Sequence, residues 1–141
     1  MKPAPQGWPR LSSALFYDDA NAAIAWLCKA FGFEVRLKVD AEDGSVIHSE
    51  LLFGEAVVMV GPSSRDKRFA SPTSVGGMNT QTLMLYVDDV AAHCERARAA
   101  GARILSEPKV TDYGEGYWAD RHYGVEDLGG HLWYFAQRVR G

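Results

Sequence analysis

The fold is decided by the stretch GYWADRHYGVEDLGGHLWYFAQ, residues 116–137. Two runs rich in aromatic and β-branched residues flank an acidic, glycine-rich segment, a pattern typical of a β-hairpin whose turn needs residues that tolerate positive φ. Rings, two histidines and an arginine are denser here than a purely structural hairpin requires. The stretch therefore predicts the last hairpin of a sheet and one wall of a binding site.

The first half of the chain has the pattern of one helix among four strands. We expect the strands at residues 11–17, 33–39, 46–53 and 56–60, the second from its alternation of apolar and charged residues. Between the first two strands, apolar residues recur at i, i+3, i+4 and i+7, the spacing of one helix face. Asp18 and Asp19 suit the N-terminus of this helix, and Gly32 ends it.

The same β-α-β-β-β pattern recurs in the second half. Residues match at a displacement of 70 positions (85 minus 15): Leu85, Tyr86, Asp88, Asp89 and Ala92 repeat Leu15, Phe16, Asp18, Asp19 and Ala22. Val90, Cys94 and Ala97 form the expected buried face of the second helix. A strand is expected to begin at residues 102–105, and an irregular loop is expected over 108–116. The duplication predicts an α+β fold of tandem β-α-β-β-β units, with facing curved sheets that form a cleft.

Shifts in composition along the chain indicate its domain organisation. We expect an N-terminal arm at residues 1–10, a first unit at 11–61, a linker at 62–80 and a second unit at 81–138, together one domain.

The chain has 141 residues, 47% of them hydrophobic and 23% charged, with a net charge of −3. The sequence has no basic stripe that could bind phosphates, so we expect no nucleic-acid partner. No run approaches the roughly 18 apolar residues of a membrane span, so we expect no membrane segment. Cys28 and Cys94 fall in helical patterns and are interpreted as buried free thiols, which indicates a reducing compartment, the cytoplasm.

The duplicated unit resembles the vicinal oxygen chelate superfamily, which includes glyoxalase I, bleomycin-resistance proteins and extradiol dioxygenases. The resemblance rests on the two helices that start Asp-Asp and on a last hairpin that reads Gly124-Val125-Glu126-Asp127 and then Gly130-His131-Leu132-Trp133. It covers about residues 11–137 and is greatest to small bacterial glyoxalase/bleomycin resistance/dioxygenase-like proteins. The family's usual Asp-Pro-x-Gly turn is Asp127-Leu128-Gly129-Gly130 here, where two glycines can supply the same bend.

The resemblance also implies where a metal site would lie. Enzymes of the superfamily place His, Gln or Glu ligands at one inward position on the first and last strand of each unit. In this sequence those positions fall on Ser12, Met59, Thr82 and Tyr134. Because a catalytic divalent ion prefers imidazole or carboxylate ligands, we expect no metal and no cofactor.

These four residues, with Phe16 and Tyr86, would line the cleft with rings, a thioether and hydroxyls, a surface that suits a flat aromatic ligand. His48 and Glu50 share one strand face, and three interpretations stay open: a hydrogen-bonding or acid–base pair, a fragment of a metal site, or an exposed edge pair.

Arg121 and His122 alternate faces of the last hairpin, so only one of them faces the cleft. Arg121 could bind an anionic ligand or pair with a neighbouring carboxylate: Asp120, Glu126 or Asp127. Trp118 is expected at the mouth of the cleft, and His93 on the solvated helix surface.

The leading hypothesis is a glyoxalase/bleomycin-resistance-like protein without the metal site, which binds a small aromatic or amphipathic molecule without making or breaking a bond. One alternative is a metal-dependent lyase or dioxygenase that uses displaced ligands, His48, Glu50 and His122. Another is a non-catalytic interaction module whose cleft is filled by its own side chains. Whether the protein is an enzyme stays open. The resemblance also implies a homodimer, because many members of the superfamily form one.

Overall fold

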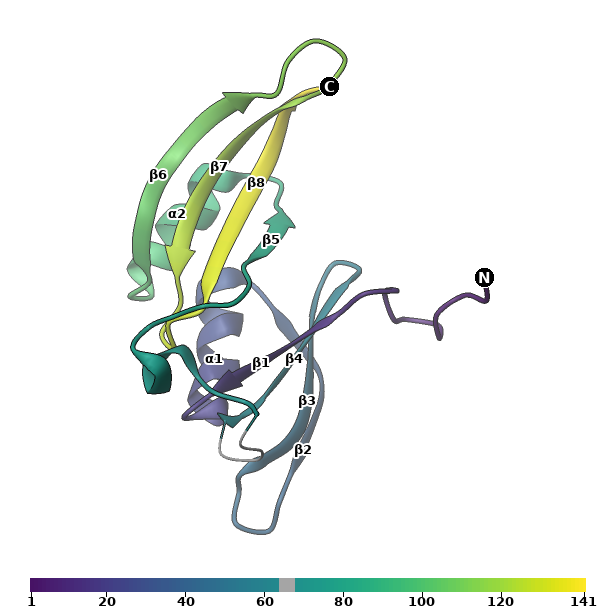
Figure 1. Cartoon of the computed structure of the whole chain (residues 1–141), viewed down its shortest axis with the longest axis vertical. Helices are drawn as coiled ribbons and strands as arrows, with labels where there is room; N and C mark the ends of the chain where they lie inside the picture. Colours follow the sequence, from purple (N-terminus) through teal and green to yellow (C-terminus); the bar gives the residue numbers. More distant parts are fainter. Residues whose placement is uncertain (64–67) are drawn as a thin grey trace. The chain divides into compact units, whose positions relative to one another are not determined.

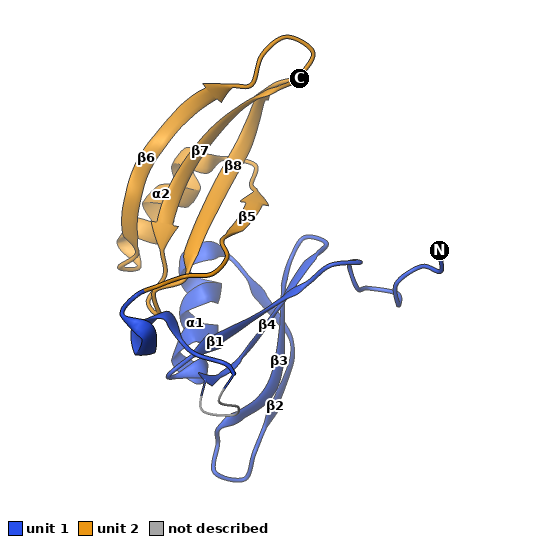
Figure 2. Cartoon of the chain, viewed as in Figure 1, with its two compact units in different colours: residues 1–77 blue, residues 78–141 orange. Residues whose placement is uncertain are grey.

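The computed structural model, described for residues 1–63 and 68–141, divides into two compact units, Met1–Gly77 and Met78–Gly141 (Figure 2). In its described residues, each unit contains one α-helix and a four-stranded mixed sheet in the order β-α-β-β-β, so the predicted α+β fold of tandem units is confirmed (Figure 1). Part of the predicted linker, residues 64–67, lies outside the described residues. The cleft expected between the two sheets stays a prediction.

Unit 1 holds β1 (Ser13–Tyr17), α1 (Ala20–Phe31), β2 (Glu34–Asp40), β3 (Val46–Phe53) and β4 (Ala56–Pro62). Its sheet has the order β1-β4-β3-β2, with β1 parallel to β4 and the other pairs antiparallel. A short 3-10 helix, η2 (Pro72–Val75), follows the sheet.

Unit 2 repeats this arrangement with β5 (Leu83–Tyr86), α2 (Val90–Ala99), β6 (Arg103–Asp112), β7 (Ala119–Glu126) and β8 (Leu132–Arg140). The sheet order is β5-β8-β7-β6, and only β5 and β8 are parallel. The topology of the two sheets is therefore the same. No helix among the described residues has the length and apolar character to cross a membrane.

In each unit the helix covers one face of the sheet, and the strand residues on that face form the core. The core of unit 1 includes Leu15, Tyr17, Leu27, Phe31, Leu51 and Val60, and that of unit 2 includes Val90, Cys94, Ala97, Tyr123, Val125, Trp133 and Phe135. The predicted helix face of Val90, Cys94 and Ala97 is confirmed. Neither cysteine is in a disulfide, as expected; Cys94 is buried, whereas Cys28 is half-buried, and burial raises the pKa of each thiol.

The predicted hairpin is confirmed as β7, a turn and β8. The turn is held by the buried carboxylate of Asp127, whose Oδ1 accepts hydrogen bonds from the backbone N–H groups of Gly129 and His131, each at 2.9 Å. Its Oδ2 accepts a third, at 2.9 Å, from the indole of Trp133. Gly130 adopts a φ of 89°, which a glycine permits without strain. One acidic side chain thus joins the turn to the core.

Two expectations about secondary structure and packing are wrong. Residues 108–112 are not part of a loop, because β6 continues through Pro108 to Asp112. The ladder between β6 and β7 shifts register between Ser106 and Lys109, and β6 is an edge strand, so the missing N–H of proline disrupts no regular pairing.

The second correction concerns His93. It does not lie on the solvated surface of α2: its Nδ1 is 2.7 Å from the hydroxyl of Tyr123, and its ring contacts Phe135 at 4.2 Å between centroids. Burial raises the pKa of the Tyr123 phenol far above its usual range. His93 is therefore half-buried between α2 and the sheet, and its contact with Tyr123 connects α2 to β7.

Candidate functional site

Each sheet has a second face, opposite its helix, which we call the open face. In unit 1, Met59 of β4 pairs in register with Ala14 of β1 and with Glu50 of β3, so these side chains share one side of the sheet. The alternation along the strands adds Phe16 and His48 to this face. Ser12, immediately before β1, keeps the same alternation. The structure thus brings the predicted site residues of unit 1 to a common face.

The polar part of this face is a cluster around Glu50. His48 Nε2 lies 2.7 Å from Glu50 Oε2, and Arg36 Nε donates to Oε1 at 3.0 Å. The hydrogen bond with His48 has the largest effect on Glu50 and lowers its pKa. The bond from Arg36 lowers it further, whereas burial opposes both. Both carboxylate oxygens are therefore engaged by side chains of this unit.

The N-terminal arm contributes to the same cluster. The backbone carbonyl of Gly7 accepts a hydrogen bond of 2.6 Å from Arg36 Nη1, and the Arg36 guanidinium lies 4.6 Å from the centre of the Trp8 ring. Arg36, which the sequence did not single out, connects the arm to the His48–Glu50 pair.

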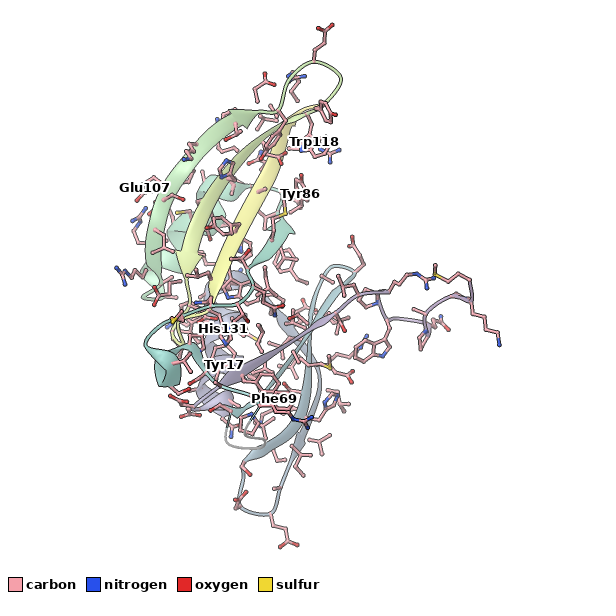
Figure 3. All side chains as sticks on the ribbon, viewed as in Figure 1. Tyr17, Phe69, Tyr86, Glu107, Trp118 and His131 are labelled. Carbon is pink, nitrogen blue, oxygen red and sulfur yellow. The ribbon has the colours of Figure 1, made fainter. Side chains whose placement is uncertain are left out.

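An aromatic ring of the chain itself stacks on the open face of unit 1. Phe69, labelled in Figure 3, lies parallel to Phe16, with 4.3 Å between ring centroids and 5° between planes. Offset or parallel stacking of this kind is the geometry expected for a flat ring on an aromatic side chain. Phe16, a predicted ligand contact, is therefore covered by the chain's own ring.

The open face of unit 2 carries exposed rings. Tyr134 of β8 pairs with Met84 of β5, and Tyr86 of β5 pairs with Ala136 of β8. Tyr86, Tyr134 and Trp118 are 41%, 39% and 38% exposed. The structure thus places three predicted ring contacts in one unit, whose helix packs on the opposite face.

Gly124 fixes the position of the Tyr134 ring. The two residues pair across β7 and β8, and a Cβ atom at Gly124 would lie 3.0 Å from Tyr134 Cε1 and 3.0 Å from Ser106 Oγ. The missing side chain lets the ring lie against the sheet with its outer side exposed.

Asp120 joins two of these rings and was not predicted as a site residue. It is 1% exposed, and its Oδ2 accepts hydrogen bonds from the Tyr86 hydroxyl at 2.8 Å and from the Trp118 indole at 3.1 Å. Figure 3 shows both rings on unit 2. Period-two alternation could have identified Asp120, because it stands midway between Trp118 and His122 on one strand face. By the same alternation, Arg138 lies on the same face of β8 as Tyr134.

His122 and Arg121 lie on opposite faces of β7, as the alternation predicts. His122 is on the open face, where its Nε2 lies 2.7 Å from the hydroxyl of Thr111. Arg121 has the alternation of Tyr123 and is exposed. In the described parts of the chain it forms no ion pair with Asp120, Glu126 or Asp127, so that expectation is wrong.

The four positions that the family resemblance assigns to metal ligands carry side chains that suit a divalent ion poorly. Met59 and Tyr134 lie on open faces, and Ser12 and Thr82 stand just before β1 and β5. Their donors are a thioether, a phenol and two hydroxyls, which are poor ligands for such an ion. Within the described residues, no group of three His, Cys, Asp or Glu side chains is arranged to hold a metal.

A hollow of about 350 Å³ lies elsewhere in unit 1, lined by Gly32, Glu34, Leu52, Phe53 and Gly54. None of the predicted site residues lines it.

Known proteins give an independent comparison. The uncharacterized protein Rv0887c of Mycobacterium tuberculosis is 37% identical over 135 residues, 94% of this chain and 76% of the relative. The crystal structure of TioX from Micromonospora sp. ML1 is similar with a TM-score of 0.72 and 31% identity, covering 93% of this chain and 99% of TioX.

A third likeness shows the fold alone. TnmS3, an antibiotic binding protein from Streptomyces sp. CB03234, has a TM-score of 0.63 at 18% identity, with 91% of this chain and 93% of TnmS3 covered. The model of the Glyoxalase/Bleomycin resistance protein/Dioxygenase superfamily matches residues 11–135. The chain therefore belongs to this superfamily, as its duplicated units and last hairpin predict.

Proposed function

We propose that the protein binds a small, flat aromatic or amphipathic molecule on the open face of unit 2 and holds it without chemical change. The observation that carries the proposal is the group of three exposed rings, Tyr86, Trp118 and Tyr134, on a face opposite the unit's helix. Exposed rings with a few polar groups nearby are the usual lining of a small-molecule site.

Simple energetics favour a flat ligand. Each 100 Å² of apolar surface removed from water contributes about 2.5 kcal/mol, and the strands hold the rings in place before binding. In unit 1, the parallel stack of Phe69 on Phe16 is an internal example of a ring held on such a face. Polar groups beside the rings, Asp120 and His122, would orient the ligand by hydrogen bonds.

The comparisons support small-molecule binding in general, without identifying the ligand. The superfamily includes bleomycin resistance proteins, and the similar fold of TnmS3 belongs to an antibiotic binding protein. A ligand of this chemistry, sequestered rather than converted, is consistent with the donor set at Ser12, Met59, Thr82 and Tyr134.

A second candidate function is acid–base catalysis at the His48–Glu50 pair of unit 1. The short contact of 2.7 Å and the lowered pKa of Glu50 favour it, because a charged carboxylate orients and polarises an imidazole. A metal-dependent lyase built on His48, Glu50 and His122 is less favoured, since both oxygens of Glu50 are already hydrogen-bonded.

One experiment separates binding from catalysis. The full chain is incubated with naphthalene, quinoline and anthraquinone derivatives, and affinity is measured by isothermal titration calorimetry. We expect Trp118→Ala and Tyr134→Ala each to weaken binding about tenfold, while Leu128→Ala, an exposed residue in the β7–β8 turn, leaves it unchanged.

The recovered compound is then examined by mass spectrometry. Unaltered compound supports sequestration, whereas a product that disappears in His48→Ala supports the second candidate. Affinities that are equal in the ring variants and in wild type would contradict the site on unit 2. A homodimer and a cytoplasmic location remain predictions, the first testable by sedimentation equilibrium.

A further inference from the structure

On the open face of unit 2, the buried carboxyl group of Asp120 has hydrogen-bond donors at only one of its two oxygens. Oδ2 of Asp120 accepts both available hydrogen bonds, from Tyr86 and Trp118. Oδ1 is also buried, and among the described residues it has no hydrogen-bond partner. Most buried polar atoms in proteins have a hydrogen-bond partner, so a buried acceptor without a protein donor is a candidate contact for a ligand.

A positive charge already lies against the same two rings. Arg138 of β8 lies opposite Asp120 of β7 in the strand register. Its Cζ lies 5.5 Å from the centre of the Tyr86 ring and 5.4 Å from that of the Trp118 ring. Both distances are within the range of cation–π attraction. The Arg138 guanidinium does not donate to Oδ1 of Asp120, so this oxygen has no donor among the described residues.

Two ring faces with a carboxylate behind them are the features by which proteins recognise organic cations. Building on the function proposed above, we propose that the ligand carries an ammonium or guanidinium group. This group displaces the Arg138 guanidinium from Tyr86 and Trp118 and donates a hydrogen bond to Oδ1 of Asp120. In the free protein, the side chain of Arg138 stands in for the cation of the ligand.

An anionic ligand fits the same residues less well. Arg138 could attract it, but Oδ1 of Asp120 would still have no donor, and the ligand charge would lie close to a carboxyl group of the same sign. The arrangement therefore selects a cation and disfavours an anion.

The test uses three probes that share one ring system and differ in charge: 2-naphthylmethylammonium, 2-naphthalenemethanol and 2-naphthoate. Calorimetry on the full chain is expected to show the ammonium bound about tenfold more tightly than the alcohol, and naphthoate bound most weakly. Asp120→Asn should bring the ammonium to within about twofold of the alcohol. Arg138→Ala should tighten ammonium binding about threefold or more, because it removes the internal competitor.

Asp120→Asn changes a buried group, so its fold is compared with wild type by circular dichroism. Arg138 is exposed, and its variant gives a second readout that does not depend on the core. Leu128→Ala is the control.

Equal affinity for the ammonium and the alcohol would overturn the cation site while leaving the binding of flat molecules intact. Tightest binding of naphthoate, lost in Arg138→Ala, would also overturn it. Absence of binding by all three probes would count against the cation site and the proposed function together.

Discussion

Asp19 and Asp89 do the same work at positions 70 residues apart (89 minus 19). Each is the N-cap of its helix, and each carboxylate accepts a hydrogen bond from the backbone N–H three residues later, Ala22 at 3.0 Å and Ala92 at 3.1 Å. We expect Asp19→Ala and Asp89→Ala each to lower the free energy of unfolding by about 1 kcal/mol, measured by urea denaturation. Asp88→Ala, exposed and outside the cap, is the control, and an equal loss there would contradict the capping role.

Stability at low pH should depend on Asp18. Its carboxylate accepts hydrogen bonds from the hydroxyls of Ser71, Thr73 and Ser63, in that order of effect, and they lower its pKa. A lowered folded-state pKa stabilises the fold above the unfolded value of about 3.9, and this contribution disappears as pH falls through the folded value.

Chemical denaturation of wild type and Asp18→Asn across this range checks the prediction. The difference in unfolding free energy should be constant near neutral pH and shrink with acidification. Asp88→Asn changes the equivalent residue of unit 2 and should show no such trend. A difference that is independent of pH would rule out the mechanism.

Stability at high pH should depend on Tyr123. Because burial raises the pKa of its phenol, the neutral form is favoured in the folded state. This contribution is complete below the unfolded pKa of about 10 and is lost as pH rises beyond it. Tyr123→Phe should remove this alkaline decline, and it should also lower stability by about 1 kcal/mol at neutral pH because the bond to His93 is lost. Tyr113→Phe, at an exposed site, should do neither.

The ring of Tyr134 should move if Gly124 gains a side chain. A methyl group there would meet Tyr134 Cε1 and Ser106 Oγ at 3.0 Å, closer than normal contact. We expect Gly124→Ala to destabilise the protein by about 1 kcal/mol and to weaken binding of planar compounds. Gly61→Ala adds a methyl group to a strand where nothing lies within 4 Å, so it should be neutral in both assays. Unchanged affinity in Gly124→Ala would argue against a ligand on Tyr134.

The duplicated fold was predictable because its signals are local. The Asp-Asp starts of both helices, Gly32 after α1 and the acidic turn at Asp127 each act within a few residues of their own position. Period-two alternation likewise predicted that Arg121 and His122 lie on opposite faces, although it left open which of them faces the ligand. Pro108 misled the prediction of β6, since the register shift that accommodates it depends on the partner strand.

The Asp120 cluster was harder to predict because it depends on three strands. Tyr86 comes from β5, Asp120 from β7 and Arg138 from β8, and their contacts exist only after the sheet has formed. An aspartate next to Arg121 in sequence suggested an ion pair, whereas strand alternation sends the two side chains to opposite faces. Cross-strand neighbours, rather than sequence neighbours, define this part of the site.

The central claim is that a flat ligand binds against the rings on the open face of unit 2. The most direct measurement is a ¹H–¹⁵N NMR titration with the tightest-binding planar compound, following the indole N–H signals of the four tryptophans. The account predicts a saturable shift of the Trp118 signal, assigned with Trp118→Phe, while that of Trp133, buried on the helix side, stays in place. Saturable binding that leaves the Trp118 signal unmoved would contradict it.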